Sequence, residues 1–238
     1  MTLEGELVPV TPMRAAIARR MTESKQQAPH FYVSAEIETD ALAATLAEEG
    51  GRAGVRIGAT AGLVRAAAIA LRAHPRVNSV WTDDGLLQVR DVNVGVAIAL
   101  PDGLIAPAVL GAGELDLAAT GRALADLVER ARAKKLRGSE MTDATFTLSN
   151  LGMFGVSQFS AIVTPPQVAI LATGRSLPRL LPSPDGPRTA AVMTATLSVD
   201  HRALDGADAA AFLDTFREAV EAPESLVRTD DLREEAKA

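Results

Sequence analysis

The longest run without a charged residue, residues 144–174, constrains this chain most. Its 31 residues exceed the roughly 20 that a helix needs to cross a bilayer. The run also contains the adjacent prolines Pro165 and Pro166 and several serine, asparagine and glutamine side chains, which are costly in hydrocarbon. We therefore interpret it as buried protein interior or as a subunit interface.

Composition excludes several classes of protein. The 238 residues are 47% hydrophobic, which is enough for a packed core and excludes a disordered chain. The formal net charge of −6 argues against a general nucleic-acid binder, which would carry a basic surplus. Without cysteine, the chain has no disulfide, thiolate zinc site, iron–sulfur cluster or cysteine nucleophile. The acidic N-terminus lacks an apolar signal core, so we expect a cytoplasmic protein that binds neither nucleic acid nor membrane.

Hydrophobic spacing predicts one α+β domain with a mixed sheet and helices packed on it. Thr11 suits the cap of a first helix and Pro12 its first turn. The predicted helices cover residues 12–27, 40–49, 60–73, 114–135 and 208–219. The predicted strands cover residues 30–39, 77–81, 86–90, 92–100, 105–110, 145–149, 167–173 and 189–199.

His201 is the strongest candidate for a catalytic side chain. It lies between an apolar strand and an amphipathic helix, where a rigid frame can hold an accessible ring. Histidine ordinarily titrates near pH 6.5, which makes it a natural general base. The alternative is a structural loop histidine paired with Asp200 or Asp205. One histidine and two aspartates, without a second histidine nearby, do not indicate a metal site.

A second candidate is the segment TLSNLGMFG, in which Ser149 and Asn150 end a predicted strand before a glycine-rich loop. A hydroxyl at such a turn can donate a hydrogen bond to a developing oxyanion. A serine nucleophile is a weaker alternative because the G-x-S-x-G elbow is absent. An ordinary strand end remains the structural alternative, and no phosphate-loop motif follows.

These segments together resemble a known family. HRALDG, with Asp200 before it, resembles the His-x-x-x-Asp-Gly motif of the chloramphenicol acetyltransferase superfamily. The TLSNLGMFG segment, 52 positions earlier from serine to histidine, is similar to that of dihydrolipoyl acyltransferase catalytic domains, the acyltransferase components of 2-oxo acid dehydrogenase complexes. Further segments agree in order and spacing: MRAAIARRM, APHFYVS, HPRVNS, NVGVAI, DGLIAP and PPQVAIL.

The resemblance divides the chain and implies a fold. It implies a catalytic domain at residues 9–226, preceded by an extension at residues 1–8 and followed by a charged tail at residues 227–238. It also implies a two-layer sandwich of the chloramphenicol acetyltransferase type. The implied assembly is a homotrimer with active sites between subunits, although the sequence does not distinguish a trimer from a larger cage.

The resemblance further implies roles for individual residues and a substrate, coenzyme A, without a metal. His201 would deprotonate the attacking nucleophile, and Ser149 of the neighbouring subunit would stabilise the oxyanion. Asp205 would hold the histidine loop through an ion pair with Arg14, for which Arg19 and Arg20 are alternatives. Residues expected near coenzyme A are Asn150, Arg132 and Lys135.

The chain departs from the family in having no lipoyl attachment site and no linker, and in ending on a charged segment. We therefore expect a stand-alone enzyme that acylates a hydroxyl group of a small molecule. The alternative is the excised core of a dihydrolipoyl acyltransferase, which moves an acyl group from dihydrolipoamide to coenzyme A. A condensation domain is roughly twice this length, and a non-catalytic scaffold would lack the histidine or the serine.

Overall fold

The computed structural model describes residues 4–100 and 103–227. The helices are α1 (Pro12–Gln27), α2 (Asp40–Ala53), α3 (Ala59–Ala73), α4 (Leu117–Arg132), α5 (Gly138–Thr142), α6 (Gly206–Glu221) and α7 (Glu224–Val227), with short 3-10 turns η1 (Ala112–Glu114) and η2 (Gly152–Phe154). The strands are β1 (His30–Glu38), β2 (Ser79–Thr82), β3 (Gly85–Gln88), β4 (Val94–Val96), β5 (Ile98–Leu100), β6 (Gly103–Ile105), β7 (Ala108–Val109), β8 (Phe146–Asn150), β9 (Ala169–Thr173), β10 (Leu177–Leu181) and β11 (Arg188–Asp200).

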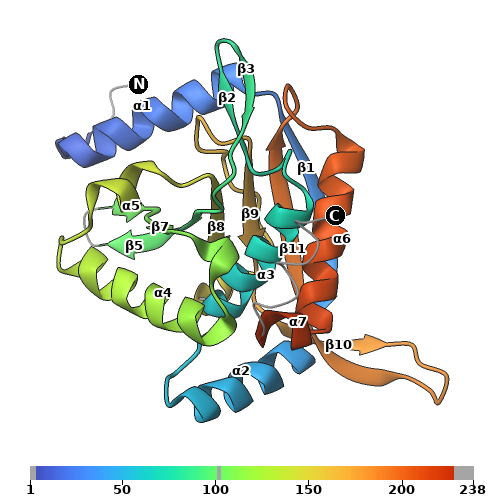
Figure 1. The fold of residues 1–238 in the computed structure, drawn as a ribbon. Helices are drawn as coiled ribbons and strands as arrows, with labels where there is room; N and C mark the ends of the chain where they lie inside the picture. The colour runs from blue at the N-terminus through green and yellow to red at the C-terminus, as the bar shows by residue number, and fades with distance from the viewer. Residues whose placement is uncertain (1–3, 101–102, 228–238) are drawn as a thin grey trace.

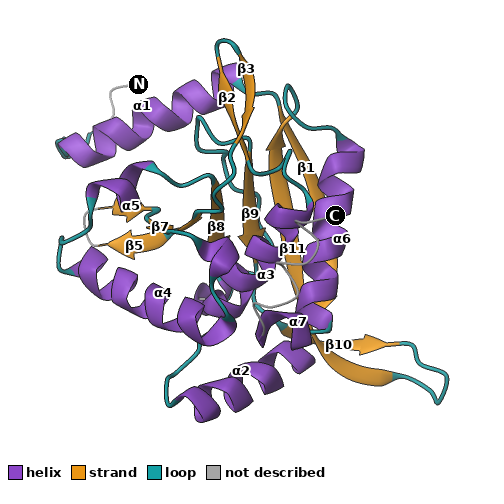
Figure 2. Cartoon of the chain, in the orientation of Figure 1, coloured by secondary structure: helices purple, strands orange, loops and turns teal. Residues whose placement is uncertain are grey.

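Seven strands form one mixed sheet in the order β1-β11-β9-β8-β4-β7, with β10 paired to β11. Strand β8 runs parallel to β4 and β9, whereas β1, β9 and β10 run antiparallel to β11. Helices α3 and α6 pack together against this sheet, and α4 packs against α3 (Figure 1). The hairpins β2–β3 and β5–β6 stand apart as two small sheets (Figure 2). The predicted α+β class with a mixed sheet is confirmed.

The side chains of strand β8 point alternately to the two faces of the sheet, one facing the core and the other facing the candidate site. Phe146 and Leu148 are fully buried in the apolar cluster, and the Phe146 ring lies 5.5 Å from that of Phe212 on α6. Burying each such side chain contributes about 1.5–3 kcal/mol, which fixes the face that β8 turns toward the helices. Because successive strand residues point to opposite faces, Thr147 and Ser149 point away from this core.

The uncharged run at residues 144–174 is only partly buried. Strands β8 and β9 lie inside the sheet, as predicted for protein interior. Between them, Met153 and Phe154 in η2 are 75% and 63% exposed. Interior burial therefore explains the two strands but not the connecting loop. No helix within the described part of the chain combines the length and hydrophobicity that crossing a membrane requires.

Two predicted elements have different bounds in the structure. Helix α2 continues through Gly50 and Gly51 to Ala53 and ends at Gly54, whose φ of +63° suits glycine. The apolar run at residues 92–100 is one predicted strand, but Ala97 divides it. There the chain leaves β4 of the main sheet and enters the separate β5–β6 hairpin. Uniform hydrophobicity cannot reveal such a change of partner.

The long helix predicted at residues 114–135 begins later and ends earlier. Asp116 is its cap, with a carboxylate oxygen 2.6 Å from the backbone nitrogen of Ala119, so α4 begins at Leu117 and ends at Arg132. Elements α5, α7 and β10 were not predicted. Within the predicted tail, Val227 closes α7, and residues 228–238 lie outside the described part.

Candidate active site

His201 occupies the turn between β11 and α6, as predicted. Its backbone N–H donates to the carbonyl of Pro29 over 2.9 Å, and the preceding N–H, that of Asp200, donates to Val168 over 2.8 Å. The imidazole lies 5.0 Å from the ring of Phe31, centroid to centroid, and His201 is exposed. The backbone at the end of β11 is therefore held by the residues just before β1 and just before β9, while the His201 ring remains accessible.

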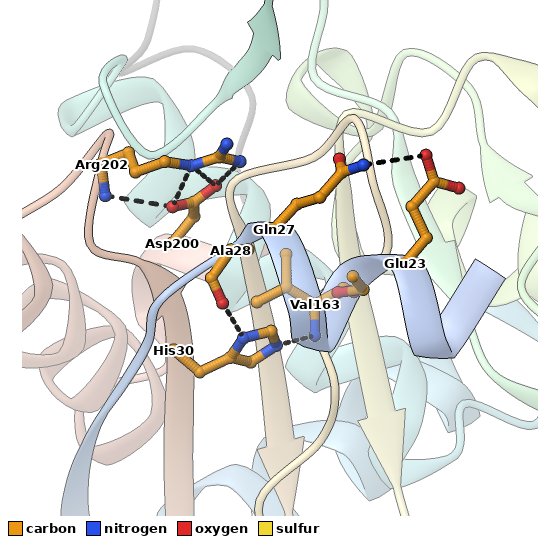
Figure 3. Close-up of polar contacts among 8 residues, drawn as sticks. Glu23, Gln27, Ala28, His30, Val163, Asp200 and Arg202 are labelled. Carbon is orange, nitrogen blue, oxygen red and sulfur yellow. Dashed lines mark hydrogen bonds and ion pairs between the residues drawn. The ribbon is translucent and has the colours of Figure 1, made fainter. Parts of the chain in front are cut away.

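Asp200 does not pair with His201 but with Arg202. The Arg202 guanidinium donates from Nη2 to Oδ2 of Asp200 over 2.6 Å and from Nε to Oδ1 over 3.0 Å (Figure 3). The backbone N–H of Arg202 also donates to Oδ1, and the Asp200 carboxylate is only 2% exposed. Because the Arg202 guanidinium donates hydrogen bonds to Asp200, its pKa is raised above its ordinary value. Asp200 therefore holds Arg202 and not the imidazole of His201.

Asp205 caps helix α6 rather than pairing with Arg14. Its Oδ1 accepts the backbone N–H groups of Ala207 and Asp208 over 2.9 and 3.0 Å. The N–H of Asp208, followed by that of Ala207 and by the charges of Arg76 and His201, lowers the pKa of Asp205. Arg14 is exposed on α1, and the structure does not bring it to Asp205 within one chain. Within one chain Asp205 therefore acts as a helix cap, and its ion pair with Arg14 stays a prediction.

Ser149 lines a groove of about 520 Å³ between α1 and the sheet. The serine is half-buried, and the groove wall beside it is fixed by Thr147, which donates to the side-chain oxygen of Gln167 over 2.7 Å. Apolar side chains of α1 and β6 make much of the remaining wall, including Met13, Ile17 and Leu104. A volume in this range is typical of sites for small organic molecules.

Ser149 and His201 do not meet within one chain. In the register of the sheet, Ser149 pairs with Ala172 on β9, and Ala172 pairs with Thr196 on β11. Thr196 precedes His201 by five residues, so the two positions differ by about 16 Å along the strand direction. Two strand spacings add about 10 Å across the sheet. His201 is also not among the residues that line the Ser149 groove.

The three residues predicted near coenzyme A are not gathered into one cluster. The Asn150 side chain accepts from the N–H of Gly152 over 2.9 Å and donates to Oγ1 of Thr60 over 3.1 Å. The Asn150 side chain therefore joins the loop after β8 to the first turn of α3. Arg132, the last residue of α4, and Lys135, three residues further on, are exposed, and in the described part of the chain neither forms a hydrogen bond or ion pair with Asn150.

Two further side chains, His30 and Trp81, lie beside the His201 loop. The imidazole of His30 accepts the N–H of Val163 at Nε2 over 3.0 Å, so Nδ1 carries the proton that it donates to Ala28 over 2.8 Å (Figure 3). This ring ties the start of β1 to the segment before β9. Trp81 lies under the Arg202 guanidinium, 4.5 Å from the ring centroid. No spacing rule connects either residue with a loop far along the chain.

Comparisons with known proteins show the family of the chain. Residues 3–228 match the model of the 2-oxoacid dehydrogenases acyltransferase (catalytic domain) family. The dihydrolipoyllysine-residue acetyltransferase component of the mitochondrial pyruvate dehydrogenase complex from Dictyostelium discoideum is 40% identical over 95% of this chain, which covers 36% of that protein. The chain spans about a third to a half of the length of the first curated relatives that it matches.

Solved structures share the fold. The dihydrolipoamide acetyltransferase of Azotobacter vinelandii superposes with a TM-score of 0.89 at 29% identity, covering 94% of this chain and 95% of that one. A study of that enzyme's mechanism concerns a serine, a histidine 52 positions later and an asparagine four positions after the histidine. Chloramphenicol acetyltransferase superposes at 0.54 with 13% identity over 94% of this chain and 99% of that chain, and so shares the fold.

One expectation is overturned by these comparisons. The stand-alone enzyme acting on a small-molecule hydroxyl is wrong, because relatives about 40% identical are acetyltransferase components of the pyruvate dehydrogenase complex. The alternative, a dihydrolipoyl acyltransferase core, agrees better with them. By sequence and by fold, this chain belongs to the family of 2-oxoacid dehydrogenase acyltransferase catalytic domains.

Proposed function

We propose that this chain transfers an acetyl group between a dihydrolipoyl thiol and coenzyme A. The observation that carries the proposal is a matched spacing. Ser149 precedes His201 by 52 positions, as the serine precedes the histidine in the Azotobacter enzyme, and both side chains are accessible in this fold. The apolar walls of the Ser149 groove suit the aliphatic arm of a dihydrolipoyl group.

In this proposal His201 takes the proton from the thiol of coenzyme A. An ordinary thiol has a pKa of about 8.5, so a base increases the reactive thiolate at neutral pH. The sulfur attacks the carbonyl carbon of the acetyl thioester, and the carbonyl oxygen becomes an oxyanion that accepts the hydroxyl proton of Ser149 in a hydrogen bond. When the tetrahedral intermediate collapses, the dihydrolipoyl sulfur leaves and takes the proton back from the imidazolium.

Asp205 supports this chemistry indirectly in our proposal. It stands four positions after His201, where the Azotobacter study concerns an asparagine. An aspartate or an asparagine can cap a helix, because each offers a side-chain oxygen to the first free N–H groups. We propose that Asp205 fixes the start of α6, and with it the end of the histidine loop, rather than moving a proton.

We further propose that the acting unit is a homotrimer in which each site combines two copies. The separation of Ser149 from His201 within one chain supports this assembly. So does the uncharged loop between β8 and β9, whose Met153 and Phe154 are exposed in a single chain. A cyclic arrangement brings the histidine loop of one copy to the serine groove of the next in every site.

An assay with acetyl-coenzyme A and dihydrolipoamide tests the proposed activity, with appearance of free coenzyme A as the measurement. We expect acetylation of the thiol and a loss of about 10²- to 10⁴-fold in His201→Ala, because the general base is removed. The control acceptor carries hydroxyl groups in place of both thiols. No acetylation of dihydrolipoamide, or an unchanged rate in His201→Ala, would contradict the proposal.

A further inference from the structure

The residues on either side of His201 are tied to each other. Asp200 accepts from the backbone N–H of Arg202 and from two nitrogens of its guanidinium, over 2.6 to 3.1 Å. The next two backbone N–H groups, of Ala203 and Leu204, donate to the carbonyl of Asp200 over 3.0 and 3.1 Å. His201 is therefore the middle residue of a closed turn, and its peptide groups cannot rotate unless Arg202 moves.

The outer side of this turn lies on the only tryptophan of the chain. The Arg202 guanidinium is 4.5 Å from the centroid of the Trp81 ring, a geometry in which the cation and the π-face attract each other. Arg202 is about one third exposed and Trp81 half-buried, so the contact is only partly screened by water. A planar guanidinium can both stack on the ring and pair with a carboxylate, which an ammonium group cannot do.

Trp81 is itself firmly placed. Its backbone N–H donates to the carbonyl of Pro166 over 2.7 Å, and its neighbour Val80 forms a β-bridge with Gln167. Pro166 and Gln167 also line the groove that contains Ser149. The hairpin β2–β3 therefore connects the histidine turn of a chain with the wall of its serine groove.

We infer that Arg202 and Trp81 are positioning residues that hold His201 for catalysis, the Trp81 ring acting through the Arg202–Asp200 pair. This inference rests on the acyl transfer proposed above. The pair Asp200–Arg202 fixes the backbone of the turn, and the indole face fixes the guanidinium. The carbonyl of Pro29 holds the same turn from the opposite side. The imidazole is thus oriented by a frame that leaves its ring free for substrate.

The test compares Trp81→Leu with Trp81→Phe. Leucine removes the π-face and phenylalanine keeps one. We expect kcat to fall about tenfold in Trp81→Leu and less than about threefold in Trp81→Phe, the scale set by a partly exposed cation–π contact. The KM for coenzyme A should stay within about twofold in both, because the orientation of His201 matters in the transition state.

Tryptophan fluorescence provides a readout that does not depend on activity. With a single tryptophan, the emission of the folded protein reports on Trp81 alone. We expect Arg202→Met to shift this emission, whereas Arg90→Met, which changes an exposed arginine beyond β3, should leave it unchanged. Circular dichroism and thermal unfolding confirm that each compared variant is folded.

A Trp81→Leu variant with the kcat of the wild type would overturn the inference. So would a fall of kcat that is equally large in Trp81→Phe, since a ring would then not be what matters. An unchanged emission in Arg202→Met would refute the contact itself. If the wild-type protein does not acetylate dihydrolipoamide, the proposed function fails instead, and the emission of Arg202→Met still decides whether Arg202 lies on Trp81.

Discussion

Glu140 shows how one buried carboxylate can organise a junction between helices. It is 4% exposed, and both of its oxygens accept from the guanidinium of Arg130 on α4, over 2.6 and 2.7 Å. The backbone N–H of Arg137 donates to the same carboxylate over 2.7 Å. The hydrogen bond from Arg130 lowers the pKa of Glu140 below its ordinary value of 4.5 and outweighs the opposing effect of burial. The pair thereby joins α5, which precedes strand β8, to α4.

This shift predicts a pH dependence of stability. Between the lowered pKa and about pH 4.5, the unfolded chain binds the Glu140 proton and the folded chain does not. The stabilisation by the charged form is therefore complete above about pH 4.5 and is lost as the pH falls through the folded pKa. Glu140→Gln should show a smaller loss of unfolding free energy than wild type between about pH 5 and pH 3 in urea titrations.

Glu129→Gln is the matched control, because Glu129 is exposed on α4, beside Arg130 in the sequence. Its loss of stability on acidification should equal that of the wild-type protein. An acid profile of Glu140→Gln as steep as that of the wild type would show that the pair does not carry this dependence.

At the level of residues, sequence predicted what lies close along the chain. The motif around His201 identified an accessible histidine between a strand and a helix, and the structure places it there. The ion pair of Asp205 with Arg14 stays a prediction, and within one chain Oδ1 of Asp205 accepts the N–H groups of α6 two and three residues away. The partner of Asp200 was missed although it is only two residues distant, because spacing does not say which way a flexible side chain folds.

At the level of elements, hydrophobic periodicity predicted a helix or strand correctly where the whole element packs against the same neighbours. Helix α1 has the predicted bounds, and its cap Thr11 accepts the N–H of Arg14 over 3.2 Å. Strand β1 alternates as predicted, with exposed Tyr32, Ser34 and Glu36 between residues that are half-buried or, at Ile37, buried. Periodicity failed at residues 92–100, where two strands of different sheets follow each other. It also missed β10, which has no continuous buried face.

Gly174, directly after β9, permits the loop that follows β8 to approach the sheet. A Cβ placed there would lie 2.0 Å from the carbonyl oxygen of Ser157, a backbone atom that cannot move aside alone. Gly174→Ala should therefore lower the free energy of unfolding by about 2 kcal/mol or more, as overpacking in a fixed backbone does. Urea unfolding followed by circular dichroism measures the change.

Gly51→Ala is the control for this substitution. Gly51 lies within helix α2, and a Cβ there meets no atom within 4 Å. Alanine should leave stability unchanged or raise it by up to about 1 kcal/mol, because it restricts the unfolded chain. Equal effects of the two substitutions would contradict the close approach at Gly174.

At the level of the whole molecule, the two residues proposed to form the site, His201 and Ser149, lie at different ends of the sheet. Strand β11 delivers His201 at its end, whereas the parallel pair β8–β9 delivers Ser149 at the opposite end. Sequence could not show this, because the direction of pairing between β9 and β11 decides it. The family resemblance implied that the serine comes from a neighbouring subunit, and the separation of the two residues supports our proposal of that assembly.

Mixing two inactive variants tests the shared site most directly. His201→Ala and Ser149→Ala are co-expressed with different affinity tags, and assemblies that carry both tags are compared with randomly mixed ones. In a trimer that contains both variants, one of the three sites receives an intact histidine and an intact serine. Random mixing makes about three quarters of the trimers mixed, so acetyl transfer should return to about a quarter of the wild-type rate. Activity no higher than that of the separate variants would contradict a site built from two copies.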